Sequence, residues 1–258
     1  MAIAILYEDN HLIAVDKPAG MLAQNDHSGD VSLLDVTKEY LRERYAKQGN
    51  VFLGLVHRLD RPVSGVMLFA KTSKAAGRLQ QQFADRRTLK LYAAAVEGAI
   101  THAASGWVRC ESILTRIRDR TVAATVSREN QHAPRHAFNA VMEYTILASA
   151  PEYSLLLIRL VTGRKHQIRA QLSLLGMPIV GDVKYGARQP LPDGSICLHA
   201  AYLAIDHPVG GKRLELISPV PSRIASLFGD VRDVQMMARE NFCSDTHLRF
   251  RLTNSPYE

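Results

Sequence analysis

Cysteine is scarce in this chain, and the few cysteines that it has stand far apart. The 258 residues include three, Cys110, Cys197 and Cys243, and no two of them form a C-x-x-C pair. An odd and scattered set argues against a disulfide framework and against a cysteine-ligated zinc site. It fits a protein that works in a reducing compartment.

Long apolar runs and metal-binding patterns are also missing. No apolar stretch reaches the length of a membrane span. The first residues, MAIAILYED, carry no basic segment and soon reach Glu8 and Asp9, so they do not form a signal peptide. The ten histidines include no H-E-x-x-H sequence. We therefore expect a cytoplasmic protein with no membrane partner and no metal.

Acidic residues are outnumbered by basic ones. Thirty-two lysines and arginines face twenty-five aspartates and glutamates, which gives a formal net charge of +7. A surplus of this sign suits a polyanionic partner such as nucleic acid, but it also serves solubility. Charge alone does not decide between these two explanations.

The apolar pattern predicts more strands than helices. Alternation and β-branched residues indicate strands at residues 3–7, 12–16, 66–70, 91–96, 106–110, 122–126, 137–147, 153–161, 196–205 and 213–217. Helical spacing indicates helices at 32–47, 73–86 and 165–175, and a short helix opens at Pro221. The helices do not alternate regularly with the strands, which excludes a doubly wound parallel sheet. We expect an α+β fold, one domain over residues 1–229 with a mainly antiparallel or mixed sheet flanked by helices, and a C-terminal extension over 230–258.

A short loop before the predicted strand 66–70 concentrates charge around Asp60. His57, Arg58, Asp60 and Arg61 fall within five positions. A carboxylate among so much positive charge should stay ionised, which suits a nucleophile or a charge stabiliser better than a proton donor. The H-R-L-D sequence superficially matches a kinase catalytic loop, but no glycine-rich phosphate loop or D-F-G accompanies it. The loop alone leaves a structural, salt-bridged aspartate open as the alternative.

Five segments together resemble the motifs of one enzyme family. They are HRLDRPVSG at 57–65, KLYAAAVEG at 90–98, TGRKHQIR at 162–169, PIVGDVKYG at 178–186, and LHA at 198–200 with HP at 207–208. In content and order they resemble the RluA family of pseudouridine synthases. A single short match carries little weight, whereas five in one order are specific.

The resemblance implies a reaction and three catalytic residues. The family converts uridine in RNA to pseudouridine without a cofactor, in a cleft across the sheet. Asp60 corresponds to the family's catalytic aspartate, Arg169 to the arginine that pairs with it, and Tyr92 to the tyrosine that stacks on the target uracil. Three routes stay open for Asp60: attack at C6 of the base, attack at C1′ of the ribose, or removal of a ribose proton.

Further residues are assigned to substrate or RNA binding. Arg58 corresponds to the family arginine that enters the helix stack where the uridine has left. His57, Arg164 and Lys165 are also assigned to substrate or RNA binding. His57 is given no role in proton transfer. Arg164 is also a weaker candidate for the partner of Asp60. The remaining basic segments, at 86–90, 116–120 and 212–213, line an RNA path if they converge in space and are otherwise solvated faces.

The sequence therefore predicts an RNA pseudouridine synthase that acts as a monomer on structured RNA, either tRNA or rRNA. The alternative is an RNA-binding module of the same fold whose catalytic activity has lapsed. Val63 and Lys165 stand where the family commonly has threonine or serine, which bears on target choice more than on activity. The family often carries an N-terminal S4 domain; here the pattern begins at Tyr7, so we expect a short form without one.

Overall fold

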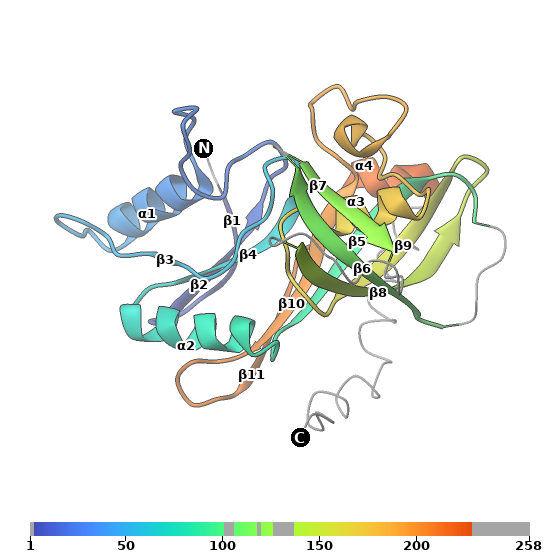
Figure 1. Cartoon of the computed structure of the whole chain (residues 1–258). Coiled ribbons are helices and arrows are strands. Elements are labelled where there is room, and N and C mark those ends of the chain that lie inside the picture. Colours follow the sequence, from blue (N-terminus) through green and yellow to red (C-terminus); the bar gives the residue numbers. More distant parts are fainter. Residues whose placement is uncertain (1–2, 101–105, 118–119, 126–136, 229–258) are drawn as a thin grey trace, which may run out of the picture.

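The structure, a computed structural model, describes residues 3–100, 106–117, 120–125 and 137–228 (Figure 1). In this part of the chain eleven strands form one sheet with helices packed on it. The α+β class and the mixed sheet agree with the prediction from the sequence. The strands are β1 (Ala4–Glu8), β2 (Leu12–Lys17), β3 (Gly54–Leu55), β4 (Ser64–Ala70), β5 (Leu89–Glu97), β6 (Val108–Ile117), β7 (Arg120–Thr125), β8 (Ala137–Ser149), β9 (Tyr153–Leu160), β10 (Leu198–Asp206) and β11 (Arg213–Ile217). The helices are α1 (Leu33–Arg44), α2 (Ser73–Ala84), α3 (Gln167–Leu174) and α4 (Ser222–Ala225), with 3₁₀ turns at Val183–Tyr185 and Ser226–Phe228.

The strands run in the order β1-β2-β4-β10-β5-β9-β8-β6-β7, with β11 beside β10 and β3 beside β4. All described pairs are antiparallel except β4 with β10. Strands β10 and β5 therefore join a sheet half built from the N-terminal strands to one built from β6 to β9 (Figure 1). A site at this junction can draw side chains from both halves.

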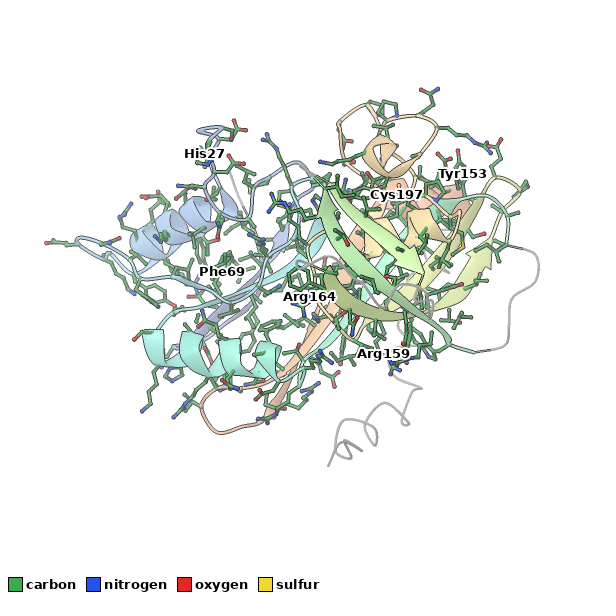
Figure 2. The ribbon with its side chains drawn as sticks, in the orientation of Figure 1. His27, Phe69, Tyr153, Arg159, Arg164 and Cys197 are labelled. Carbon is green, nitrogen blue, oxygen red and sulfur yellow. The ribbon has the colours of Figure 1, made fainter. Side chains whose placement is uncertain are left out.

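The N-terminal half is buried on both faces. Odd-numbered residues of β2 and β4, such as Ile13 and Phe69, share a core cluster with Leu33 and Leu41 of α1. Their even-numbered neighbours pack in a second cluster with Leu79 of α2. Helices α1 and α2 thus cover opposite faces of these strands (Figures 1 and 2). Burial on both faces explains why β4 is apolar almost throughout.

The helix boundaries follow local capping chemistry. Ser32 caps α1 and forms a capping box with Asp35. The α2 cap is Thr72, whose side chain accepts a hydrogen bond from the Ala75 backbone N–H. Helix α3 begins at Gln167, two residues later than predicted, because His166 adopts a left-handed backbone with φ of +55°. Gly176, at φ of +73°, follows the end of α3.

Strand lengths differ more from the prediction. Strand β6 runs through Ile117, seven residues past the predicted end, because it pairs with both β7 and β8. The two-residue β3 was not predicted. The proposed extension 230–258, Cys243 and part of the basic segment 116–120 lie outside the described residues. Among the described helices, none is long and apolar enough to cross a membrane.

Gly65 lies where the two halves of the sheet meet, opposite Ala200 in the parallel pairing of β4 with β10. Its φ is +119°, and an added Cβ would lie 2.3 Å from the Ala200 carbonyl oxygen. We expect Gly65→Ala to lower the free energy of unfolding by about 3 kcal/mol or more, because it adds backbone strain to a clash with main chain. Urea unfolding monitored by circular dichroism measures this change.

Gly77 is the matched control for this substitution. It lies on the exposed side of α2, and an added Cβ there would meet no atom within 4 Å. Gly77→Ala should leave stability unchanged or raise it by up to about 1 kcal/mol, since alanine favours a helix. Equal effects at the two glycines would contradict the close approach of β4 to β10.

Candidate active site

The loop that carries Asp60 lies between β3 and β4, at the junction of the two sheet halves. A buried lysine fixes its backbone. Lys17, at the end of β2, has no exposed surface, and its ammonium donates hydrogen bonds to the carbonyl oxygens of Pro18, Met21 and Arg61 at 3.0, 2.7 and 3.1 Å. Because Arg61 adjoins Asp60, Lys17 holds the main chain next to the carboxylate. The sequence analysis assigned Lys17 no role.

Asp60 and Arg169 come together as the sequence predicts, but the guanidinium fork is directed elsewhere. Arg169 Nη1 lies 3.3 Å from Asp60 Oδ2. Its Nε and Nη2 donate to the two carboxylate oxygens of Asp182 at 2.6 and 2.8 Å. Arg169 and Asp182 are almost fully buried, whereas the Asp60 side chain is 24% exposed. Asp182 therefore fixes the guanidinium of Arg169, and the Nη1 atom of that guanidinium faces Asp60.

His166 is a second neighbour of Asp60 that the sequence analysis did not identify. Its Nε2 lies 3.5 Å from Asp60 Oδ2, and its Nδ1 lies 2.9 Å from the hydroxyl of Tyr185. The backbone N–H of Thr121 donates to that same hydroxyl at 3.1 Å. Burial lowers the pKa of His166, and the charge of Asp60 opposes this change. The left-handed backbone at His166 aims the ring at Asp60 and Tyr185.

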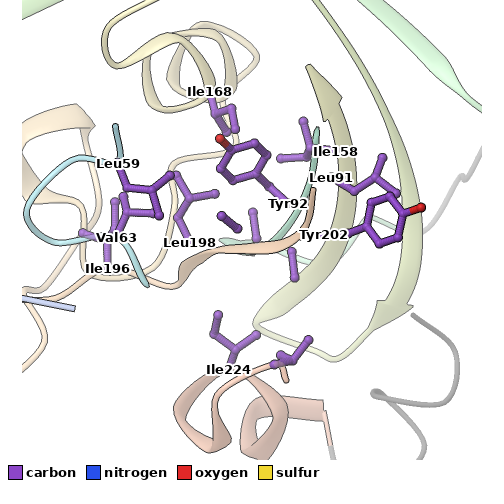
Figure 3. Close-up of a cluster of buried hydrophobic side chains, with 14 of the residues drawn as sticks. Leu59, Val63, Leu91, Tyr92, Ile158, Ile168, Ile196, Leu198, Tyr202 and Ile224 are labelled. Carbon is purple, nitrogen blue, oxygen red and sulfur yellow. The ribbon is translucent and has the colours of Figure 1, made fainter. Parts of the chain in front are cut away.

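Asp60 opens into a cavity of about 150 Å³ whose walls are partly apolar and partly polar. Engineered cavities of about this volume admit a single six-membered ring. Figure 3 shows Tyr92 beside Ile168, with Leu59, Val63 and Leu198 around it. The lining residues are Arg58, Leu59, Asp60, Val63, Tyr92, Leu160, Gly163, Arg164, Lys165, His166, Gln167, Ile168, Arg169 and Leu198. The three predicted catalytic side chains, Asp60, Tyr92 and Arg169, thus line one cavity. The Asp60 carboxylate lies beside the apolar part of its wall.

Tyr92 is nearly buried on β5, between small alanines and the cavity. Burial raises the pKa of its phenol, and the negative charge of Asp60 raises it further. Tyr92 is therefore a neutral hydroxyl at physiological pH, with a ring that forms part of the cavity wall. Such a group can pack against a flat base and can donate or accept one hydrogen bond.

The residues assigned to RNA binding divide into two groups. Arg58, Arg164 and Lys165 are exposed side chains at the mouth of the cavity, with Arg164 5.0 Å from the ring centroid of Phe138. Arg164 does not approach Asp60 as a partner in any described contact. His57 is turned inward: its Nε2 accepts a hydrogen bond from the Leu68 backbone N–H at 2.9 Å. His57 therefore supports β4, although its ring still borders a neighbouring cavity.

The inward position of His57 predicts a pH dependence of stability. Burial lowers its pKa to about 3, and nearby Lys90 adds to the effect. Below about pH 6.5 the unfolded chain takes up a proton at His57 that the folded protein does not bind. We expect the free energy of unfolding to be highest above pH 6.5 and to fall toward pH 4 by up to about 1.4 kcal/mol per pH unit from this residue.

Urea unfolding at several pH values tests this expectation. His57→Gln keeps an oxygen that can accept from Leu68 and removes the titrating ring. Its unfolding free energy should fall less steeply between pH 6 and pH 4.5 than that of the wild type. Identical slopes for the two proteins would show that His57 is not held neutral.

Among the described residues, no three His, Cys, Asp or Glu side chains are grouped to hold a metal ion. The charged centre of the site consists of Asp60, Arg169, Asp182 and His166. Its chemistry is that of an oriented carboxylate facing a pocket for a planar ring.

Comparisons with known proteins show the family to which the chain is similar. A family model described as RNA pseudouridylate synthase matches residues 11–174. The chain is 32% identical over 249 residues to a ribosomal large subunit pseudouridine synthase D of Xanthomonas campestris, covering 92% of this chain and 71% of that protein. It is 33% identical over 216 residues to a tRNA pseudouridine synthase C of Haemophilus ducreyi, covering 81% and 87%. The solved structure of human RNA pseudouridylate synthase domain containing 4 superposes with a TM-score of 0.66 at 25% identity, covering 92% and 93%.

Proposed function

The chain belongs to the RluA family of RNA pseudouridylate synthases, and we propose that it isomerises uridine in structured RNA with Asp60 as the reacting carboxylate. One observation carries this proposal. Asp60 lies at the edge of a ring-sized cavity, 3.3 Å from an arginine that is itself anchored by a buried carboxylate. A salt-bridged aspartate with a purely structural role needs no such cavity.

The reaction rearranges one nucleoside without outside reagents. The bond between N1 of the base and C1′ of the ribose breaks, the base turns, and a bond from C5 to C1′ forms. The proton on C5 leaves to solvent and N1 gains one, so atoms and electrons balance. Asp60 assists by attack at C6, by attack at C1′, or by taking a ribose proton, and each route needs an ionised carboxylate. Arg169 and His166 hold that carboxylate in place.

The other residues prepare the base for this step. A base in a folded RNA must leave its stack before an enzyme can reach C1′, at a cost of a few kcal/mol. Tyr92 and the leucines of the cavity receive the uracil ring, and stacking on an aromatic face offsets part of that cost. Arg58, exposed at the cavity mouth, inserts its planar cation where the base has left. Arg164 and Lys165 contact the backbone phosphates.

The relatives include a ribosomal large subunit pseudouridine synthase and a tRNA pseudouridine synthase, which supports rRNA or tRNA as the substrate. We propose that the protein acts on one of these in the cytoplasm as a monomer. Mapping pseudouridines in total RNA from cells with and without the gene identifies the target. The expected result is the loss of one or a few sites confined to tRNA or rRNA. An unchanged pseudouridine map would overturn the proposed function.

A further inference from the structure

A second cavity adjoins the candidate active site, and its charged side chains are all basic. It has a volume of about 400 Å³. Five residues line both cavities, including Tyr92 and Arg164, so the two share a wall. We call it the basic pocket. Its lining residues are Val56, His57, Arg58, Phe83, Ala84, Arg86, Lys90, Tyr92, Leu160, Val161, Thr162, Gly163 and Arg164.

The cations of the basic pocket have no anionic partners in the described part of the chain. Arg58, Arg86, Lys90 and Arg164 form no ion pair there. Arg87, the neighbour of Arg86, instead bonds to Asp206 at 2.9 Å. Unpaired charges that line one cavity without a carboxylate create a site for an anion.

Of the four cations of the basic pocket, Lys90 says most about what the pocket can bind. It rises from β5 beneath the loop at Gly163, where an added Cβ would lie 3.1 Å from its ammonium nitrogen. Burial and the charge of Arg86 lower its pKa to about 8. Lys90 is half-buried and forms no ion pair among the described residues, and it lines the basic pocket. Its ammonium is therefore available to an anion that enters this pocket.

Apolar side chains also line the basic pocket. Val56, Phe83, Leu160 and Val161 line it together with the cations, and the Phe83 ring stacks on His57 with centroids 5.1 Å apart. The volume is well above what one phosphate group fills. Apolar and aromatic walls beside unpaired cations are the combination that binds a base and its phosphate together.

We propose that the basic pocket binds the nucleotide next to the target uridine in the RNA strand, with a phosphate at Lys90 and Arg86 and the base against Phe83 and Leu160. This proposal rests on the proposed function for the identity of the first nucleotide. The phosphodiester that links the target uridine to this neighbour lies next to Arg58 and Arg164, which line both cavities. The enzyme thereby holds two consecutive unstacked nucleotides, and the second contributes to the choice of target.

The test compares two small ligands by NMR titration of the whole protein. One is uridine 3′,5′-bisphosphate, which supplies a single nucleotide. The other is the trinucleotide UpUpU, which supplies a neighbour on either side of a central uridine. The wild type should bind UpUpU roughly tenfold more tightly than the bisphosphate, as expected for one added stacked base. Lys90→Met and Arg86→Gly should each reduce this gain to about twofold.

The variants are chosen to keep the fold. Methionine matches the length of lysine, and glycine accepts the φ of +58° at Arg86. Lys74→Met, on the exposed side of α2, and Arg87→Ala are the matched controls and should keep the full gain. Unchanged circular dichroism and thermal melting for each variant show that a loss of binding is local.

The outcomes separate this proposal from the proposed function. If Lys90→Met retains the full gain for UpUpU, or if the wild type shows no gain, the basic pocket does not bind the neighbouring nucleotide. The pseudouridine map can still support the proposed function in that case. If the gain depends on Lys90 and Arg86 but no RNA is modified, the nucleotide site stands and the isomerase assignment fails.

Discussion

Asp60→Asn should abolish pseudouridine formation while leaving RNA binding largely intact. The change removes the charge and nucleophilicity of the carboxylate and hardly alters its shape. Loss of a group that acts covalently costs at least about 10⁴-fold in kcat in well-studied enzymes, and we expect a decrease of that size. Because affinity for RNA comes mainly from phosphate contacts, Kd should change by less than about threefold.

Two measurements on the purified variant test this prediction. Liquid chromatography with mass spectrometry quantifies pseudouridine in the target RNA, and fluorescence anisotropy gives Kd for the same RNA. Asp85→Asn, at the exposed C-terminal end of α2, is the matched control and should be fully active. A normal yield of pseudouridine from Asp60→Asn would refute the assignment of Asp60, whichever route the reaction takes.

The second large effect is expected at Asp182, which anchors Arg169. Its side chain is buried and accepts both arms of the guanidinium fork. Asp182→Asn leaves a buried cation without its main counterion, and breaking such a pair typically costs about 3 to 5 kcal/mol. We expect a loss of about 3 kcal/mol in urea unfolding. A large fall in kcat should accompany it, because Arg169 no longer has a fixed position beside Asp60.

A surface pair and a double variant serve as controls for Asp182. Asp206 pairs with Arg87 and Arg213 at the protein surface, and Asp206→Asn should cost no more than about 1 kcal/mol. Arg169→Met combined with Asp182→Leu removes both buried charges, so it should recover much of the lost stability. It should stay inactive, since Asp60 has lost its arginine. A double variant with near-normal kcat would show that Arg169 is not needed to position Asp60.

The sequence predicted which residues form the site better than it predicted which of their side chains contact one another. The motifs identified Asp60, Tyr92 and Arg169 as catalytic candidates, and in the structure all three line one cavity. Arg169 contacts Asp60, but its two shorter hydrogen bonds go to Asp182, a partner that the motifs did not indicate. A signal was present, because Asp182 follows the apolar PIVG segment directly, where a charged residue is buried only if it is paired.

Other contacts could not have been derived from local pattern. Lys17 holds the carbonyl of Arg61, 44 residues away in the chain. His57 faces Leu68 rather than solvent because β3 folds back onto β4, and a two-residue strand gives no periodic signal. The convergence of Arg86, Lys90 and Arg164 likewise depends on how β5 and the loop before α3 meet. Periodicity fixes which face of an element is buried, whereas these contacts depend on which elements are neighbours.

The central claim is that Asp60 drives an isomerisation in which the base never leaves the enzyme. Incubation with RNA labelled with tritium at C5 of uridine tests it most directly, because forming the C5–C1′ bond releases that hydrogen to water. The wild type should release tritium without added metal or cofactor and without free uracil, and Asp60→Asn should release none. Free uracil from the wild type, or equal tritium release from both proteins, would contradict the account.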